Sequence, residues 1–99
     1  MLKKNYSKTG EICRATFKLP AEVDAEEVLL LGEFNDWDTD NATRMKRLKD
    51  GSFSATISLK SDQSYRFRYL LDNERWENDW AADEYQPNTY GTEDSIIRI

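Results

Sequence analysis

The sequence predicts an all-β domain, an antiparallel β-sandwich of about seven short strands. Three observations favour this fold: apolar residues alternate with polar ones, turn residues recur between the alternating segments, and helical periodicity is nearly absent. A chain of 99 residues, 38% of them apolar, has room for one domain with one modest core. We therefore expect a single sandwich.

The first predicted strand alternates strictly and ends at Pro20, which lacks the N–H that a further ladder hydrogen bond needs. Its inward-facing residues are Cys13, Ala15, Phe17 and Leu19. The segment 21–27 is expected to be a loop or a single helical turn. The apolar run 28–31 ends at Gly32 and predicts a strand that is buried on both faces, as in the middle of a sandwich.

A hairpin is predicted next. The pair Asp50-Gly51 is a strong turn signal, and it joins the segments 45–48 and 53–59. In the second arm the residues expected to face inward are Phe53, Ala55, Ile57 and Leu59.

The segment 65–71 predicts a further strand, again from its alternation. The residues expected to face inward are Tyr65, Phe67, Tyr69 and Leu71, and those on the other face are Arg66, Arg68 and Leu70. A turn at 72–73 leads to a short return strand at 75–77. The last strand is expected at the end of the chain, around Ile96, Ile97 and Ile99.

Charge and composition exclude several functional classes. Fourteen Lys and Arg against nineteen Asp and Glu leave a net charge of −5, which disfavours nucleic acid and anionic membranes as partners. The single Cys13 excludes an intrachain disulfide and a multi-cysteine zinc site, and without histidine there is no imidazole base or ligand. The first residues lack the apolar region of a secretory signal, so we expect a cytoplasmic protein.

Carboxylates are numerous, but their pattern predicts neither an enzyme nor a metal site. Asp79 and Glu84 have the spacing of a glycosidase-like pair, yet nothing in the sequence promises the apolar pocket that a catalytic acid needs. The acidic loop 36–41 begins like an EF-hand, but it lacks the required glycine and glutamate and is interrupted by Trp37. We therefore expect no catalytic residues, no metal and no cofactor.

Tryptophans in polar loops are the main functional candidates. Trp37 follows a buried strand, Trp76 follows a turn, and Trp80 comes soon after it. Such rings either cover an open end of the sandwich or form a platform on which the apolar C–H face of a sugar stacks, and composition alone leaves these interpretations equal. Arg68, on the outward face near Trp76, has planar donors suited to hydroxyl groups. Arg66 is expected to be a solvated charge paired with nearby acidic loops.

Four segments occur in an order that resembles a known family. They are Leu30-Leu31-Gly32-Glu33-Phe34-Asn35-Asp36-Trp37, Asp50-Gly51-Ser52-Phe53, Tyr65-Arg66-Phe67-Arg68-Tyr69 with Asp72 and Trp76, and Gly91-Thr92-Glu93-Asp94-Ser95-Ile96-Ile97. Together they resemble the early-set, immunoglobulin-like domain found at the N-terminus of isoamylases and glycogen branching enzymes, a carbohydrate-binding module of the family 48 type. The glycogen-binding domain of the AMP-activated protein kinase β subunit is the same module. The resemblance covers residues 12–99 and leaves 1–11 as an N-terminal extension, and the segment 76–88 is most similar to the isoamylase branch.

The resemblance implies a module that binds α-glucan, and it assigns residues to the binding surface. Trp37 and Trp76 match a pair of tryptophans that stack on glucose units. Arg68 matches a basic residue between them, which is usually lysine in the kinase branch.

A loop late in the chain is implied to close over the sugar. Thr92 matches a threonine of that loop. Tyr90 stands where the kinase branch has leucine, and its ring can still stack. Asp94 stands where that branch has asparagine, so it can accept hydrogen bonds from sugar hydroxyls but donates no amide proton.

We therefore expect a non-catalytic carbohydrate-binding module whose partner is an α-1,4-linked glucan, either a glycogen-like or starch-like polysaccharide or a malto-oligosaccharide. The alternative is a protein-interaction module that docks on a glycoside hydrolase or another glucan-metabolising enzyme without binding sugar itself. In that case the exposed aromatic side chains would anchor the protein interface.

Overall fold

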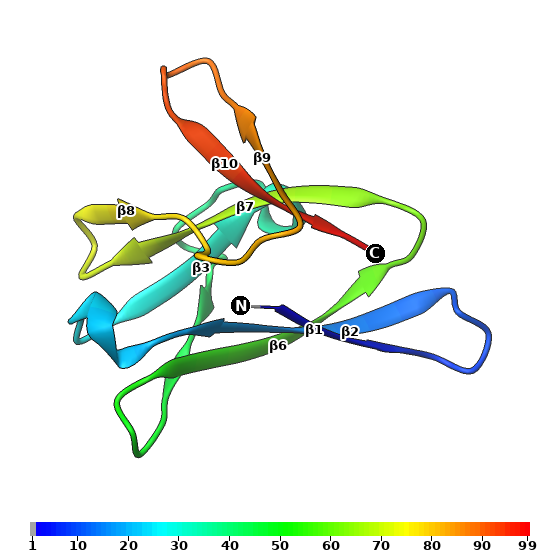
Figure 1. The fold of residues 1–99 in the computed structure, drawn as a ribbon, viewed down its shortest axis with the longest axis horizontal. Coiled ribbons are helices and arrows are strands. Elements are labelled where there is room, and N and C mark those ends of the chain that lie inside the picture. The colour runs from blue at the N-terminus through cyan, green and yellow to red at the C-terminus, as the bar shows by residue number, and fades with distance from the viewer. Residues whose placement is uncertain (1) are drawn as a thin grey trace.

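The structure is a computed structural model that describes residues 2–99, so Met1, the first residue of the predicted extension, lies outside it. The fold is all-β: two antiparallel sheets pack against each other as a sandwich (Figure 1). The strands are β1 (Leu2–Tyr6), β2 (Ile12–Leu19), β3 (Val28–Gly32), β4 (Thr43–Arg44), β5 (Lys46–Arg47), β6 (Phe53–Lys60), β7 (Ser64–Leu71), β8 (Arg75–Glu77), β9 (Glu84–Pro87) and β10 (Glu93–Arg98). Two short 3₁₀ helices, η1 (Ala21–Val23) and η2 (Glu33–Asn35), flank β3.

The strand order separates a structural sheet from the sheet that carries the candidate site. The first sheet has the order β1-β2-β6-β5. The second has the order β4-β3-β7-β10-β9, and β8 also pairs with β7. In Figure 1, β2 and β6 cross the lower layer, while β3, β7 and β10 form the upper layer. Strand β7 therefore lies at the centre of the second sheet, between β3 and β10.

Aromatic rings from both sheets fill the core. Phe17 of β2 lies edge-on to Phe67 of β7 with ring centroids 5.0 Å apart, and Phe67 lies edge-on to Tyr69 at 5.7 Å. These three side chains are fully buried. Edge-to-face pairs of this kind stabilise a core beyond the area that they bury. The Phe17–Phe67 pair joins the two layers, whereas the Phe67–Tyr69 pair lies within β7.

The sandwich prediction is confirmed, but the sheets contain ten strands among residues 2–99 rather than about seven. Strands β1, β4 and β9 are additional. None of them shows a long apolar alternation; each forms because its backbone pairs with the edge of a stronger strand. Residues 2–6 of the predicted extension thus form β1, which pairs with β2 along its whole length.

The predicted facing of the main strands is confirmed. The four inward residues of β2, Cys13 included, are fully buried, and β3 is buried on both faces except at Leu29. In β6 the inward residues at the two ends, Phe53 and Leu59, are buried. In β7 the inward residues after Tyr65 are buried. The remaining inward residues, Ala55, Ile57 and Tyr65, are partly buried and pack against the core.

The predicted turns and chain ends are also confirmed, with one boundary shifted. The hairpin around Asp50-Gly51, the return strand β8 and a single helical turn within 21–27 are all present. Strand β10 is longer than predicted at its start and ends at Arg98, one residue before Ile99. Within residues 2–99 no helix is long and apolar enough to cross a membrane.

Candidate functional site

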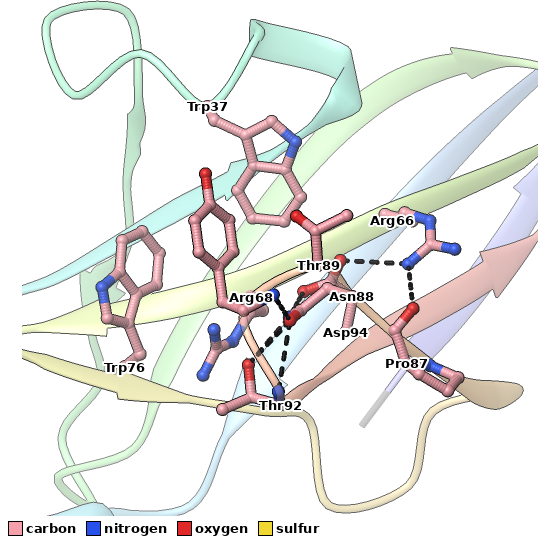
Figure 2. Close-up of a pocket in the computed structure, with 10 residues that line it drawn as sticks. Trp37, Arg66, Arg68, Trp76, Pro87, Asn88, Thr89, Thr92 and Asp94 are labelled. Carbon is pink, nitrogen blue, oxygen red and sulfur yellow. Dashed lines mark hydrogen bonds and ion pairs between the residues drawn. The ribbon is translucent and has the colours of Figure 1, made fainter.

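One face of the second sheet carries a cavity of about 990 Å³ that is rich in aromatic side chains (Figure 2). We call it the aromatic cavity. Its lining residues are Trp37, Arg66, Arg68, Trp76, Pro87, Asn88, Thr89, Tyr90, Thr92 and Asp94. They come from the loop after η2, from β7 and β8, and from the end of β9, the start of β10 and the loop between these two strands. All six residues that the sequence singled out for carbohydrate binding line this cavity.

The loop after β3 holds Trp37 in a defined position. The side chain of Asn35 accepts a 3.0 Å hydrogen bond from the Gly32 amide and donates a 3.0 Å bond to the Leu30 carbonyl. The Trp37 amide donates a 3.0 Å bond back to the Gly32 carbonyl. Both Asp36 and Trp37 have positive φ angles, 56° and 57°, which cost about 1–2 kcal/mol each for residues with a Cβ. The hydrogen-bonded turn compensates for this strain and directs the indole toward the cavity.

Gly32 allows the same loop to approach β7 closely. A Cβ at this position would lie 2.4 Å from the carbonyl oxygen of Arg66 and 2.9 Å from the ring of Phe34. Any side chain would therefore push the Trp37 loop away from β7. The Gly-Glu-Phe-Asn segment thus has a steric reason for its glycine, although the φ of Gly32 is extended and open to every residue.

Two indole rings and a guanidinium meet in the aromatic cavity. The centroids of the Trp37 and Trp76 rings lie 6.4 Å apart, with 64° between the ring planes. The Cζ atom of Arg68 lies 5.3 Å from the centre of the Trp76 ring, within the range of a cation–π contact. Trp76 is 45% exposed and Trp37 is half-buried, so neither ring belongs to the core. Figure 2 shows the three side chains grouped together, and each of them is at least partly exposed to solvent.

Asn88 organises the loop between β9 and β10. Its side-chain oxygen accepts hydrogen bonds from the amides of Tyr90 and Thr92, at 2.9 and 3.2 Å. Its side-chain nitrogen donates to the Thr92 hydroxyl at 2.8 Å and to the Asp94 carboxylate at 3.0 Å. The side-chain amide of Asn88 therefore joins Tyr90, Thr92 and Asp94 in one hydrogen-bond network. The Tyr90 ring is left 88% exposed at the loop tip, at the mouth of the cavity.

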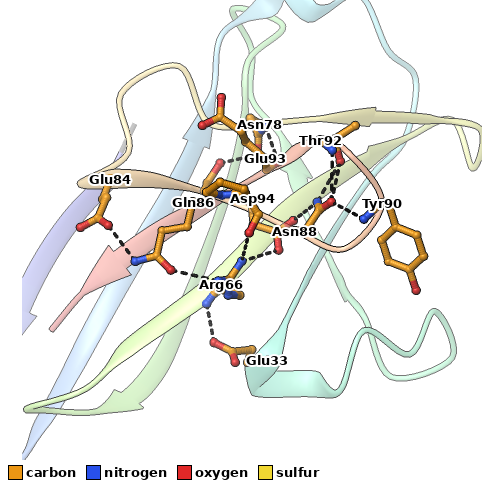
Figure 3. Close-up of polar contacts among 12 residues, drawn as sticks. Glu33, Arg66, Asn78, Glu84, Gln86, Asn88, Tyr90, Thr92, Glu93 and Asp94 are labelled. Atoms are coloured by element: carbon orange, nitrogen blue, oxygen red, sulfur yellow. Dashed lines mark hydrogen bonds and ion pairs between the residues drawn. The ribbon is translucent and has the colours of Figure 1, made fainter.

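A chain of polar contacts fixes Asp94 and Arg66 beside this loop (Figure 3). The Nη1 atom of Arg66 lies 3.2 Å from Asp94 Oδ2 and also donates to the Pro87 carbonyl. Its Nη2 atom donates a 2.9 Å bond to Gln86, whose amide donates in turn to Glu84. Because Asp94 is buried and both of its oxygens are engaged, its carboxylate holds the loop and its neighbouring strand together.

Arg66 pairs with an acidic residue, as predicted, but it is half-buried and lines the cavity, so the prediction of a solvated charge is wrong. Because residues alternate between the faces of a strand, Arg66 lies on the same face of β7 as Arg68. This alternation could have identified Arg66 as a residue of the cavity lining. Asn88 was also missed. The Asn88-Thr89-Tyr90-Gly91 segment has the pattern of an Asx turn, and that pattern could have marked Asn88 as the residue that shapes the loop.

Other side chains considered from the sequence lie elsewhere. Trp80 is 53% exposed and does not line the cavity. Asp79 is buried and accepts hydrogen bonds from the Tyr69 hydroxyl and the Ala81 amide, whereas Glu84 contacts Gln86 and forms an ion pair with Arg98. These carboxylates therefore serve the sheet and do not face the cavity as a pair.

The part of the chain that the structure describes contains no cluster of side chains that could bind a metal ion. No group of three or more Asp, Glu, His or Cys side chains within residues 2–99 is placed to hold an ion. In the acidic loop, the Asp38 carboxylate is already engaged, because it accepts hydrogen bonds from the Asp40 amide and the Asn41 side chain.

Known structures share this fold. No protein-family model matches the sequence, and no curated protein matches it. A candidate α-amylase of Salmonella typhimurium matches over 97% of this chain with a TM-score of 0.60 and 15% identity. The apo pullulanase of Paenibacillus barengoltzii matches over 96% with a TM-score of 0.53 and 24% identity. At these identities the likeness shows a common fold, and the present chain spans 14% of each of those longer chains.

Proposed function

We propose that this domain is a non-catalytic carbohydrate-binding module for α-1,4-linked glucan, of glycogen-like or starch-like type. The observation that carries the proposal is the convergence of Trp37 and Trp76, from separate parts of the chain, beside Arg68 on one solvent-facing surface. The apolar C–H faces of glucose units stack on indole rings, and their hydroxyls need polar partners at the rim. The aromatic cavity contains both kinds of group.

The relative orientation of the rings favours a curved glucan. With 64° between the planes of Trp37 and Trp76, two glucose units that stack on both rings must be strongly rotated relative to each other. Units of an α-1,4-linked chain follow a helical path and meet this condition, whereas the flat ribbon of a β-1,4-linked chain does not. The exposed Tyr90 ring at the loop tip adds a further surface for a sugar unit.

The polar rim supplies donors and acceptors. The Arg68 guanidinium and the Thr92 hydroxyl line the cavity and can bond to sugar hydroxyls. Each such bond replaces one with water, so its net contribution is only about 1 kcal/mol. We therefore expect modest affinity.

The charge of the cavity supports a binding role over a catalytic one. Glycoside hydrolysis uses two carboxylic groups on either side of the scissile bond. Among residues 2–99, Asp94 is the single carboxylate in the cavity lining, and it is already paired with Arg66. The fold comparison adds support, since amylases and pullulanases act on α-glucans and this fold makes up a small part of both matched chains.

A titration with maltoheptaose, followed through the indole N–H signals of the whole chain by NMR, tests the proposal. Binding should shift the Trp37 and Trp76 signals, and Trp37→Ala and Trp76→Ala should each weaken binding about 5- to 150-fold, because ring-stacking contacts contribute about 1–3 kcal/mol. Trp80→Ala is the matched control, since Trp80 is similarly exposed but lies outside the cavity lining. Absence of any indole shift at millimolar oligosaccharide would refute the proposal.

A docking role on a glucan-metabolising enzyme is the second candidate. It is favoured by the lengths of the two matched proteins, because in each of them this fold is 14% of a far longer chain. The exposed rings of Trp76 and Trp80 would then anchor a protein interface. Two results together would distinguish this role from the first: a protein partner that shields Trp76 from solvent, and no shift of the indole signals when sugar is added.

A further inference from the structure

The guanidinium of Arg68 lacks a carboxylate partner in the described part of the chain. It rests on the Trp76 ring, its Nε atom is buried without a hydrogen-bond partner, and no ion pair within residues 2–99 includes it. The side chain is only partly exposed. The Nε atom is out of a ligand's reach, but the terminal Nη groups of Arg68 are not among the buried unpaired atoms. An unpaired, partly buried charge is unfavourable, so the guanidinium gains when a ligand supplies an anionic acceptor to its Nη groups.

The remaining charges of the aromatic cavity balance each other. Arg66 is paired with Asp94, and Arg66 also donates to Gln86 and to the Pro87 carbonyl. Among residues 2–99, the charged side chains that line the cavity are two arginines and one aspartate, with no Lys or Glu. The cavity therefore has one excess positive charge, located at Arg68, in a chain whose net charge is −5.

We propose that the aromatic cavity prefers an anionic α-glucan, in which a glucose unit carries a phosphate ester or a carboxylate, and that Arg68 binds this anionic group. The inference rests on the proposed function: the indoles hold the sugar, and the guanidinium selects among saccharides. A guanidinium presents parallel N–H donors that match phosphate and carboxylate oxygens. The Asp94 carboxylate is neutralised by Arg66, so it does not repel the ligand, and the acidic chain neighbours of the indoles, Asp36 and Glu77, lie outside the cavity lining.

The test compares three ligands of equal length by NMR titration of the whole chain. They are maltoheptaose, maltoheptaose with one 6-phosphate ester, and maltoheptaose with one unit oxidised to glucuronate. Inorganic phosphate, which lacks the sugar, is titrated beside them. We expect the two anionic ligands to bind about tenfold more tightly than the neutral one, because an anionic group adds an ion pair and can accept two parallel N–H bonds from the guanidinium, which a neutral hydroxyl cannot do. Raising the salt concentration should reduce this preference while leaving the neutral ligand unaffected.

Variants then assign the preference to one side chain. Arg68→Gln should abolish it, and Arg68→Lys, which keeps the charge without the planar fork, should retain only part of it. Arg47→Gln is the matched control: Arg47 also lies over an aromatic ring, 5.9 Å from the centre of Phe53, but belongs to the other sheet. It should leave the preference unchanged. Amide spectra of each variant verify that the fold is intact.

The outcomes separate this inference from the proposed function. Equal affinity for neutral and anionic ligands would overturn the inference and leave the proposed function standing. A preference that survives Arg68→Gln would overturn the role of Arg68, and inorganic phosphate that binds as tightly as the phosphorylated sugar would overturn recognition of an anionic saccharide. No response to any of the three sugars would remove the proposed function and the inference with it.

Discussion

The Asn88 side chain donates a 3.0 Å hydrogen bond to the carboxylate of Asp94 and thereby ties the β9–β10 loop to strand β10. Asp94 is paired in turn with Arg66 of the neighbouring strand β7. The position of the loop tip, where Tyr90 stands over the aromatic cavity, thus depends on one amide and one ion pair. Loop order and ligand binding should therefore be linked.

Replacing Asn88 should loosen this loop more than it destabilises the domain. In Asn88→Ala the amides of Tyr90 and Thr92 lose their acceptor, so their hydrogen exchange should accelerate about tenfold, the equivalent of about one hydrogen bond. Affinity for maltoheptaose should fall severalfold, while the free energy of unfolding changes by about 1–2 kcal/mol at most. Asn5→Ala, at an exposed position on β1 of the other sheet, is the control. Weaker binding with unchanged exchange would instead mean that Asn88 contacts the sugar directly.

A side chain at position 32 should disturb the Trp37 loop through sterics. In Gly32→Ala the new Cβ would meet the Arg66 carbonyl at 2.4 Å, so the loop must move, at a cost of about 1–3 kcal/mol in unfolding free energy. The Trp37 indole signal should shift in the free protein, and glucan binding should weaken. Thermal or urea unfolding and the indole spectrum measure the two effects.

Gly10→Ala provides the contrast for that experiment. Gly10 has a φ of +76°, but a Cβ added there would enter open space, since no atom lies within 4 Å of its position. The substitution should cost about 1–2 kcal/mol from backbone strain alone and leave the Trp37 signal in place. An identical indole shift in both variants would contradict the steric explanation.

The buried Tyr69–Asp79 pair should make stability depend on alkaline pH. The Tyr69 hydroxyl donates a 2.7 Å bond to Asp79, and burial, together with the Asp79 charge, raises the pKa of Tyr69 above its usual value of 10.0. The folded state therefore keeps the Tyr69 proton where the unfolded chain loses it. Stability from this group is complete below about pH 10 and declines as the pH rises further.

Urea unfolding at pH 7 and at pH 11 measures this decline, and Tyr69→Phe is the comparison. The variant should be less stable at pH 7 by about 1–3 kcal/mol, because Asp79 loses a buried donor. Its stability should fall less steeply between the two pH values than that of the wild type. Parallel slopes for the two proteins would contradict the proposed coupling.

Local pattern was sufficient for most of the fold. The alternation in β2 determined which residues enter the core, and Asp50-Gly51 determined where the central hairpin turns. These are short-range properties, since a residue's face follows from its neighbours and a turn from two or three backbone conformations. Strands β1, β4 and β9 escaped prediction because their pairing depends on the edges of other strands and not on a pattern of their own.

The sequence by itself determined that tryptophans and an arginine occupy outward positions near turns, and the resemblance to a known family named six candidate residues. Only the tertiary structure decided that these residues share one cavity, that Asp94 is engaged by Arg66 and Asn88, and that Arg68 has no carboxylate partner within residues 2–99. The physical reason is that β7 pairs with β3, β8 and β10 at once. The registers of these pairings set which side chains meet, and no local stretch of sequence contains them.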